Sequence, residues 1–268
     1  MALTLTGMTI AGGMTFTDEV PPSGTQKALF GYGAALSPNW VSMTNLVSNT
    51  GVVSDDTTGV GTARQALAAA GYGTDKAIFG YGTGASASTA ITNLVSNTGV
   101  VASDTAGVGQ ARYGLAACSY GTDKAIFGYG YGPGVGINSI TNLVSNTGVV
   151  ATDTTGVGTS RYRLASAGYG TNKGIFGYGN DGTNDVSMTN LVSNTGVVAT
   201  DTTGVGSARS RLAAAGYGTD KAIFGYGITG GYVSMTNLVS NTGVVATDTT
   251  GVGTARYALA AAGYGSDK

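Results

Sequence analysis

The sequence predicts an all-β protein, a five-bladed β-propeller of four-stranded antiparallel blades. Glycine is one indication, because 47 of the 268 residues are glycine, as expected for a chain with many tight turns. A motif close to KAIFGYG also recurs every 48 or 49 residues, and its lysines are Lys27, Lys76, Lys124, Lys173 and Lys221. Each unit holds four short β-prone runs, which is the content of one propeller blade. The repeats assign residues 26–268 to the propeller and residues 1–25 to a separate arm.

The fifth unit shows the four expected strands in order. Residues 222–227 (AIFGYG) alternate their side chains between two faces, and residues 236–241 (TNLVSN) form a second β-prone run. An Asn-Thr-Gly turn joins this run to residues 244–249 (VVATDT) in a tight hairpin. Residues 257–265 (YALAAAGYG) are rich in alanine, but the run is short and ends in Gly-Tyr-Gly, which favours a strand. Five separate sheets would each bury too little apolar surface, so we expect the units to pack together.

The composition excludes several classes of function. The chain has no histidine and a single cysteine, so it offers no imidazole base, no His-ligated or thiolate-cluster metal site and no internal disulfide. Its 13 basic and 14 acidic residues leave a net charge of -1, which provides no basic footprint for nucleic acid. Neither a secretory leader nor an apolar run of roughly 18 residues is found. We therefore expect a soluble protein that is not an enzyme and takes no cofactor or metal.

The units also resemble kelch-type blades. Read from the arginine, the composite run ARYALAAAGYGTDKAIFGYG has an arginine ahead of an Ala-rich strand and then a strand that ends in glycine. The resemblance spans residues 27–268, although the kelch Gly-Gly doublet is Gly-Tyr-Gly here and the aromatic residue of the last strand is valine. It implies that the Ala-rich run is the innermost strand of each blade. Because the chain starts at strand two (27–33) and ends at strand one (257–265), the last run should pair with the first blade and close the ring.

A polar pair recurs in every unit, with an arginine eight residues after an aspartate. One interpretation is a ring of oxygen ligands for a cation, or of arginines for a carboxylate or sugar acid. The other is a structural ion pair between blades. The Phe and Tyr of FGYG are likewise either core residues or platforms for sugars, and Cys118, which replaces an alanine of other units, is expected to be a buried inert thiol. The ladder consists of Asp56, Arg64, Asp104, Arg112, Asp153, Arg161, Asp201, Arg209, Asp248 and Arg256.

The loops after FGYG differ strongly between units that are otherwise nearly identical. Strand direction places these loops on one face of the propeller, together with the segments that lead to each arginine. The difference is either drift in unconstrained loops or the mark of a recognition face for a host-surface glycan or protein. Irregular aromatic and polar residues of these loops are the candidate contacts, and one loop has calcium-loop composition without the full spacing. The candidates are Trp40, Tyr131, Asn180, Asp181 and Tyr232.

The first 25 residues read as a strand-turn-strand arm followed by a Pro-containing tether. Its alternating apolar residues need a partner outside the propeller, and they are Leu3, Leu5, Met8, Ile10, Met14 and Phe16. The arm and the repeats together resemble repeat-bearing structural proteins of tailed bacteriophages, especially those of cyanobacterial and other aquatic hosts. The resemblance implies a virion component, such as a capsid decoration, fibre or baseplate protein, that binds other virion proteins through residues 1–25. The alternative is a multivalent carbohydrate-binding propeller that resembles five-bladed tachylectin-type lectins.

Overall fold

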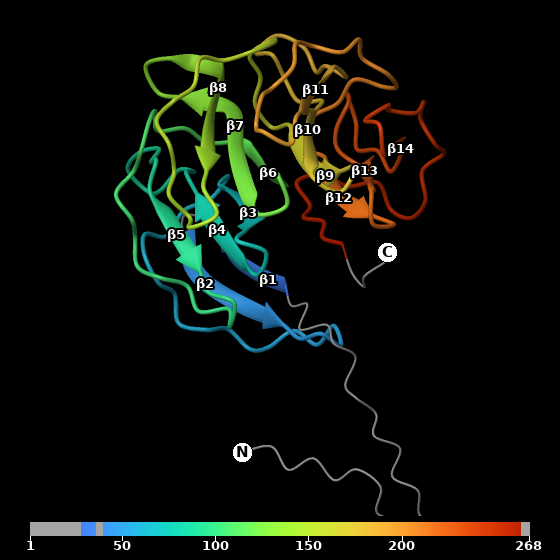
Figure 1. Ribbon diagram of the computed structural model, residues 1–268. Coiled ribbons are helices and arrows are strands. Elements are labelled where there is room, and N and C mark those ends of the chain that lie inside the picture. The colour runs from blue at the N-terminus through green and yellow to red at the C-terminus, as the bar shows by residue number, and fades with distance from the viewer. Residues whose placement is uncertain (1–27, 36–39, 264–268) are drawn as a thin grey trace, which may run out of the picture.

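The computed structural model describes residues 28–35 and 40–263 (Figure 1). The prediction of an all-β protein is confirmed, since these residues form fourteen strands in five small antiparallel sheets and contain no helix. It follows that this part of the chain has no apolar helix able to cross a membrane. The anchor-arm candidates Leu3, Leu5, Met8, Ile10, Met14 and Phe16 lie outside the described residues.

The first sheet has two strands and the other four have three. In each three-stranded sheet the strand that begins at the repeat lysine lies in the middle, between an Ala-rich strand and a Thr-Asn-Leu-Val strand. The strands are β1 (Ala28–Ala34), β2 (Trp40–Val47), β3 (Ala68–Tyr72), β4 (Lys76–Gly80), β5 (Thr92–Val95), β6 (Ala116–Tyr120), β7 (Lys124–Gly132), β8 (Gly136–Val144), β9 (Ala165–Tyr169), β10 (Lys173–Gly177), β11 (Thr189–Val192), β12 (Ala213–Tyr217), β13 (Lys221–Gly225) and β14 (Thr236–Val239).

The third β-prone run of each unit, equivalent to residues 244–249, does not form a regular strand in the structure. In the second unit this run meets β5 only at isolated bridges, Val95 with Val101 and Thr92 with Thr105. The pairing slips by one residue between these bridges, and the side chain of Asn93 donates to the carbonyl of Ala102. A side-chain amide therefore takes part in the pairing of the two segments where the register shifts. This irregularity prevents a continuous strand.

Successive Ala-rich strands lie side by side, and the sheets form an arc around them (Figure 1). β3 contacts β6, β6 contacts β9, and β9 contacts β12. The hydroxyl of Ser119 on β6 donates to the carbonyl of Gly71 on β3 at 2.8 Å. The small side chains of the Ala-rich strands allow this close approach.

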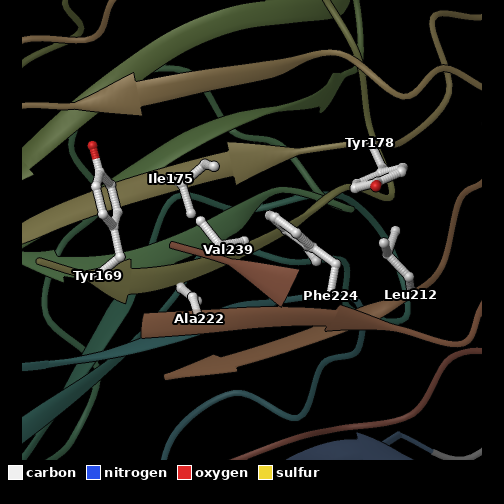
Figure 2. Packing of buried hydrophobic residues seen from close by; sticks show 9 residues of the cluster. Tyr169, Ile175, Tyr178, Leu212, Ala222, Phe224 and Val239 are labelled. Carbon is white, nitrogen blue, oxygen red and sulfur yellow. The ribbon is translucent and has the colours of Figure 1, made fainter. Parts of the chain in front are cut away.

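The apolar core lies between neighbouring sheets. Figure 2 shows one such cluster, which lies between two neighbouring sheets. Tyr169, Ile175 and Tyr178, in or next to the sheet of β9, β10 and β11, face Ala222, Phe224 and Val239 of the sheet of β12, β13 and β14. Ile175, Phe224 and Val239 are completely buried. Each sheet is therefore stabilised mainly by the apolar surface that its neighbour covers.

The expected closure of the ring is not present among the described residues. β1 pairs only with β2, and residues 257–263 form no strand and no hydrogen bond with β1. Residues 256–258 keep the backbone hydrogen bonds of the preceding units, because Gly227 donates to the carbonyl of Arg256 and Ala258 donates to the carbonyl of Arg211. The first sheet consequently lacks an Ala-rich strand in this structure.

Candidate functional site

The repeat arginines connect one unit to the next. The guanidinium of Arg64 is completely buried, and its Nε and Nη2 donate to the carbonyl of Tyr81 and to Oδ1 of Asn93 at 2.8 and 2.6 Å. Its Cζ lies 4.3 Å from the ring centroid of Tyr32 in its own unit. Arg112 and Arg209 repeat all of these contacts, and Arg161 repeats them except for the Nε bond. These side chains join four pairs of neighbouring units and are not exposed to a ligand.

Three of the repeat arginines form an ion pair with the aspartate of the following unit, not with the aspartate eight residues before them. Arg112 Nη1 is 3.7 Å from Asp153, and the equivalent atoms of Arg161 and Arg209 are 3.6 and 3.9 Å from Asp201 and Asp248. These members of the ladder thus lie at the interfaces between units, whereas Arg256 is exposed and Asp56 binds Asn45 of its own unit. Among the described residues no three His, Cys, Asp or Glu side chains are placed to hold a metal ion.

The aspartates mainly bind the turn of the preceding unit. Asp104 accepts a hydrogen bond from the hydroxyl of Thr62 at 2.7 Å and one from the amide of Asn93 at 2.9 Å. Burial pushes the pKa of Asp104 upward, but these hydrogen bonds outweigh it and leave the pKa below its usual range. The carboxylate is therefore held ionised as part of the interface.

The aromatic residues of FGYG are core residues in the described interfaces. Tyr81 and Phe127 are both completely buried, and their ring centroids are 5.1 Å apart in an edge arrangement. Burial raises the pKa of Tyr81 to about 12. Cys118 is also buried, and burial raises the pKa of its thiol to about 12, which leaves no nucleophilic thiolate at neutral pH.

The candidate polar residues of the fourth variable loop are used within the loop itself. Asn180 Nδ2 donates to Asp185 Oδ1 at 2.9 Å. Asp181 Oδ1 accepts the backbone N–H groups of Thr183 and Asn184 at 2.8 Å each. These backbone hydrogen bonds lower the pKa of Asp181. The geometry is that of an Asx-type turn and it occupies the carboxylate of Asp181.

The three candidate aromatic residues lie in three separate places. Trp40 is the first residue of β2, where it pairs with Ala34 and is partly buried, so it belongs to a strand and not to a loop. Tyr131 packs between two other tyrosines, Tyr113 and Tyr162, with centroid distances of 5.3 and 6.2 Å. Tyr232 is 58% exposed and stacks on Tyr257 at 4.7 Å. No ring contact joins Trp40 to either tyrosine group in the described ranges.

The sequence analysis missed a row of residues on the face of the variable loops, which we call the positive-φ ring. It lies two positions after each repeat arginine, and consecutive members are joined by backbone hydrogen bonds of 2.6 to 2.8 Å. All members have positive φ, between 52° and 62°. The members are Ala66, Gly114, Arg163, Arg211 and Ala258. The sequence could have revealed this position, because it holds a small residue in three units and arginine in the other two.

The opposite face holds an axial cavity. It has a volume of about 370 Å³ and lies between β6, β9, β12 and Gly263. Its lining includes Thr122, Thr171 and Lys173 from the repeated turns. Because Gly263 belongs to the segment that forms no strand, the shape of this cavity depends on how the ring ends are arranged.

No protein-family model matches this chain, and no curated protein matches it.

Proposed function

We propose that the chain is a noncatalytic structural or adhesion component of a phage particle, bound to other virion proteins through residues 1–25. One contrast carries the proposal. The interfaces between units use the same buried arginine, Asn and Tyr groups repeatedly, whereas the loops after FGYG, which strand direction assigns to one face, differ between units. A scaffold that keeps its interfaces and varies one face is suited to displaying contact residues.

The proposal includes a closed ring of five blades, with Ala-rich residues 257–265 completing the first sheet. The two end faces support it because they carry matching halves of one interface. Arg256 is exposed, whereas the four preceding repeat arginines are completely buried. Phe30 is 52% exposed, whereas its equivalent Phe79 is 6% exposed. By equivalence with Arg64, the Arg256 guanidinium would bind the carbonyl of Tyr32 and Oδ1 of Asn45.

A cavity between the first and second units has space for a side chain of the closing segment, residues 257–265. At the third unit, Gly148 lies beside both Leu94 and the ring of Tyr72. At the second unit, the equivalent Gly99 lies beside Leu46 without a tyrosine, and a cavity of about 240 Å³ opens there. In a closed ring, Tyr264 would be the sequence equivalent of Tyr72 and would fill this cavity. Apolar burial of this ring would stabilise the closed arrangement.

Removing residues 257–268 tests the closure. We expect the melting temperature to fall, because in a closed ring the first sheet loses its inner strand. The contacts of residues 257–268 with the fifth unit are lost as well. A truncated chain that melts like the parent would contradict a closed ring without affecting the virion proposal.

Particle composition tests the proposed function. Residues 1–25 would be removed from a phage genome that encodes the chain, and the purified particles would be analysed by mass spectrometry. We expect the truncated protein to fold, with an unchanged circular dichroism spectrum, but to be lost from the particles. Incorporation at the parental level would reject the anchor role of the arm.

A carbohydrate-binding propeller is the second candidate function. Tyr232 favours it, because an exposed tyrosine stacked on a second ring presents a flat apolar surface of the kind that sugars contact. A glycan array with the parent and Tyr232→Ala proteins separates the two functions. The lectin function would be favoured if glycan binding depends on Tyr232 and the protein is absent from the particles.

A further inference from the structure

Two arginines lie next to each other on the face that carries the variable loops. Arg211 donates its backbone N–H to the carbonyl of Arg163 at 2.8 Å, so the two residues are consecutive members of the positive-φ ring. Tyr162 and its loop neighbour Asn180 exchange backbone hydrogen bonds, which places Arg163 beside the fourth variable loop. Both arginine side chains are partly exposed.

Tyrosine rings flank both guanidinium groups. The Cζ of Arg163 is 4.6 Å from the ring centroid of Tyr162, and the Cζ of Arg211 is 5.4 Å from that of Tyr257. Tyr131 and Tyr232 extend the two ends of this surface by ring contacts. We call the resulting surface the Arg-Tyr crescent, and its members are Tyr131, Tyr162, Arg163, Arg211, Tyr232 and Tyr257.

No described carboxylate is paired with the two guanidinium groups of the crescent, those of Arg163 and Arg211. In the adjacent loop, Asp181 is bound to backbone N–H groups and Asp185 to Asn180. Four of the repeat arginines differ in this respect, because they are buried and bound to carbonyl and amide oxygens; they are Arg64, Arg112, Arg161 and Arg209.

The backbone at these two positions adds a second observation. Arg163 and Arg211 have φ of 56° and 52°, a region that side chains other than glycine disfavour. The equivalent residue of the second unit is Gly114, with φ of 62°. Packing therefore accepts glycine at this position, and arginine at two consecutive members is not required by the fold.

We propose that the Arg-Tyr crescent binds an acidic polysaccharide, with uronate carboxylates on the two guanidinium groups and sugar rings on the tyrosines. Guanidinium groups bind carboxylates through two parallel hydrogen bonds, and tyrosine faces pack against the C–H faces of sugars. The inference rests on the proposed recognition role of the variable-loop face, and it names the class of ligand.

Oligogalacturonate is the probe, and the carboxyl-reduced oligosaccharide is its neutral match. We expect the full chain to bind oligogalacturonate and to bind the reduced form at least about tenfold more weakly. The test variant is Arg163→Gly with Arg211→Ala, since the chain already has Gly114 and Ala66 at equivalent ring positions. Its Kd should rise by about tenfold or more while the melting temperature stays at or above the parental value.

Two controls separate the site from a general charge effect. Lys124→Ala with Lys173→Ala removes the same charge from the opposite face and should leave binding unchanged. Arg163→Lys with Arg211→Lys keeps the charge but loses the paired geometry, and it should bind more weakly than the parent. Parental binding by the glycine–alanine variant, or equal binding of a single-stranded oligonucleotide, would overturn the proposal. A parent that binds no oligogalacturonate would also overturn it, while incorporation into particles would remain the separate test of the proposed function.

Discussion

The four internal interfaces and the two end faces have nearly the same sequence but very different environments. Phe176 is completely buried between units, whereas Phe30 at the first end face is 52% exposed. Arg209 is completely buried, whereas Arg256 at the last end face is exposed. The difference teaches that burial in this molecule is supplied by the neighbouring unit, as in other repeat proteins where stability is a sum over nearest neighbours.

Replacing an interface arginine should have the largest effect. Arg112→Ala removes the donors to Tyr129 and Asn142 inside a buried interface, and we expect a loss of about 4 kcal/mol of unfolding free energy. Urea unfolding measures it. Arg256→Ala is the matched variant at the end face, and it should cost a similar amount in a closed ring but almost nothing in an open arc.

The phenylalanines provide a second form of the same comparison. Phe176→Ala should cost about 3 kcal/mol, because it leaves a cavity beside Tyr129 in a closed interface. Phe30→Ala should cost as much only if the fifth unit covers Phe30. Thermal unfolding of both variants against the parent distinguishes the cases, and equal small losses would contradict the packing of the internal interface.

High pH should weaken the internal interfaces. Burial raises the pKa of both Tyr81 and Tyr129 to about 12, above the ordinary value of 10.0. The stability associated with these raised pKa values is present below about pH 10 and is lost as the pH rises through about 12. Unfolding free energy measured by urea titration between pH 8 and 12 should fall over this window. Absorbance at 295 nm should show a tyrosine fraction that ionises late, and ionisation of every tyrosine near pH 10 in the folded protein would contradict the burial.

The smallest expected effect concerns a compensating pair between two units. Cys118 replaces the alanine of other units, and Gly174 replaces another alanine, such as Ala125. A Cβ on Gly174 would lie only 2.6 Å from Cys118 Sγ, so the larger side chain occupies the space of the missing methyl group. Gly174→Ala should therefore cost about 1 kcal/mol through overpacking, and adding Cys118→Ala should remove that cost. Additive losses in this double-mutant cycle would contradict the pairing.

Local patterns predicted most strands correctly, but the strand predicted in the third β-prone run of each unit is not formed. β3, β4 and β5 lie where alternation and the Gly-containing turns placed them. The run after β5 failed to form a strand because Asn93 donates to Ala102 and the pairing slips. Residue type within the run does not reveal this, since the donor comes from a neighbouring strand.

The residues of the proposed Arg-Tyr crescent were only partly among the sequence candidates. Tyr131 and Tyr232 were identified as irregular aromatics, and both lie at the ends of the Arg-Tyr crescent. Arg163 and Arg211 were missed, because they follow the repeat arginines in sequence and stand apart only when the positive-φ ring brings them together. Asn180 and Asp181, in contrast, have their polar groups engaged within their own loop.

By itself, the sequence determined the number of repeat units, the positions of most strands and the absence of histidine and internal disulfide chemistry, because these depend on residue type and short spacing. Only the tertiary structure decided which aspartate each arginine meets and that Cys118 fits against Gly174. The physical reason is that repeats are equivalent in sequence, so spacing alone cannot choose between the aspartate of the same unit and that of the next. Packing makes the choice, as when Asp104 binds the hydroxyl of Thr62 across 42 residues of chain.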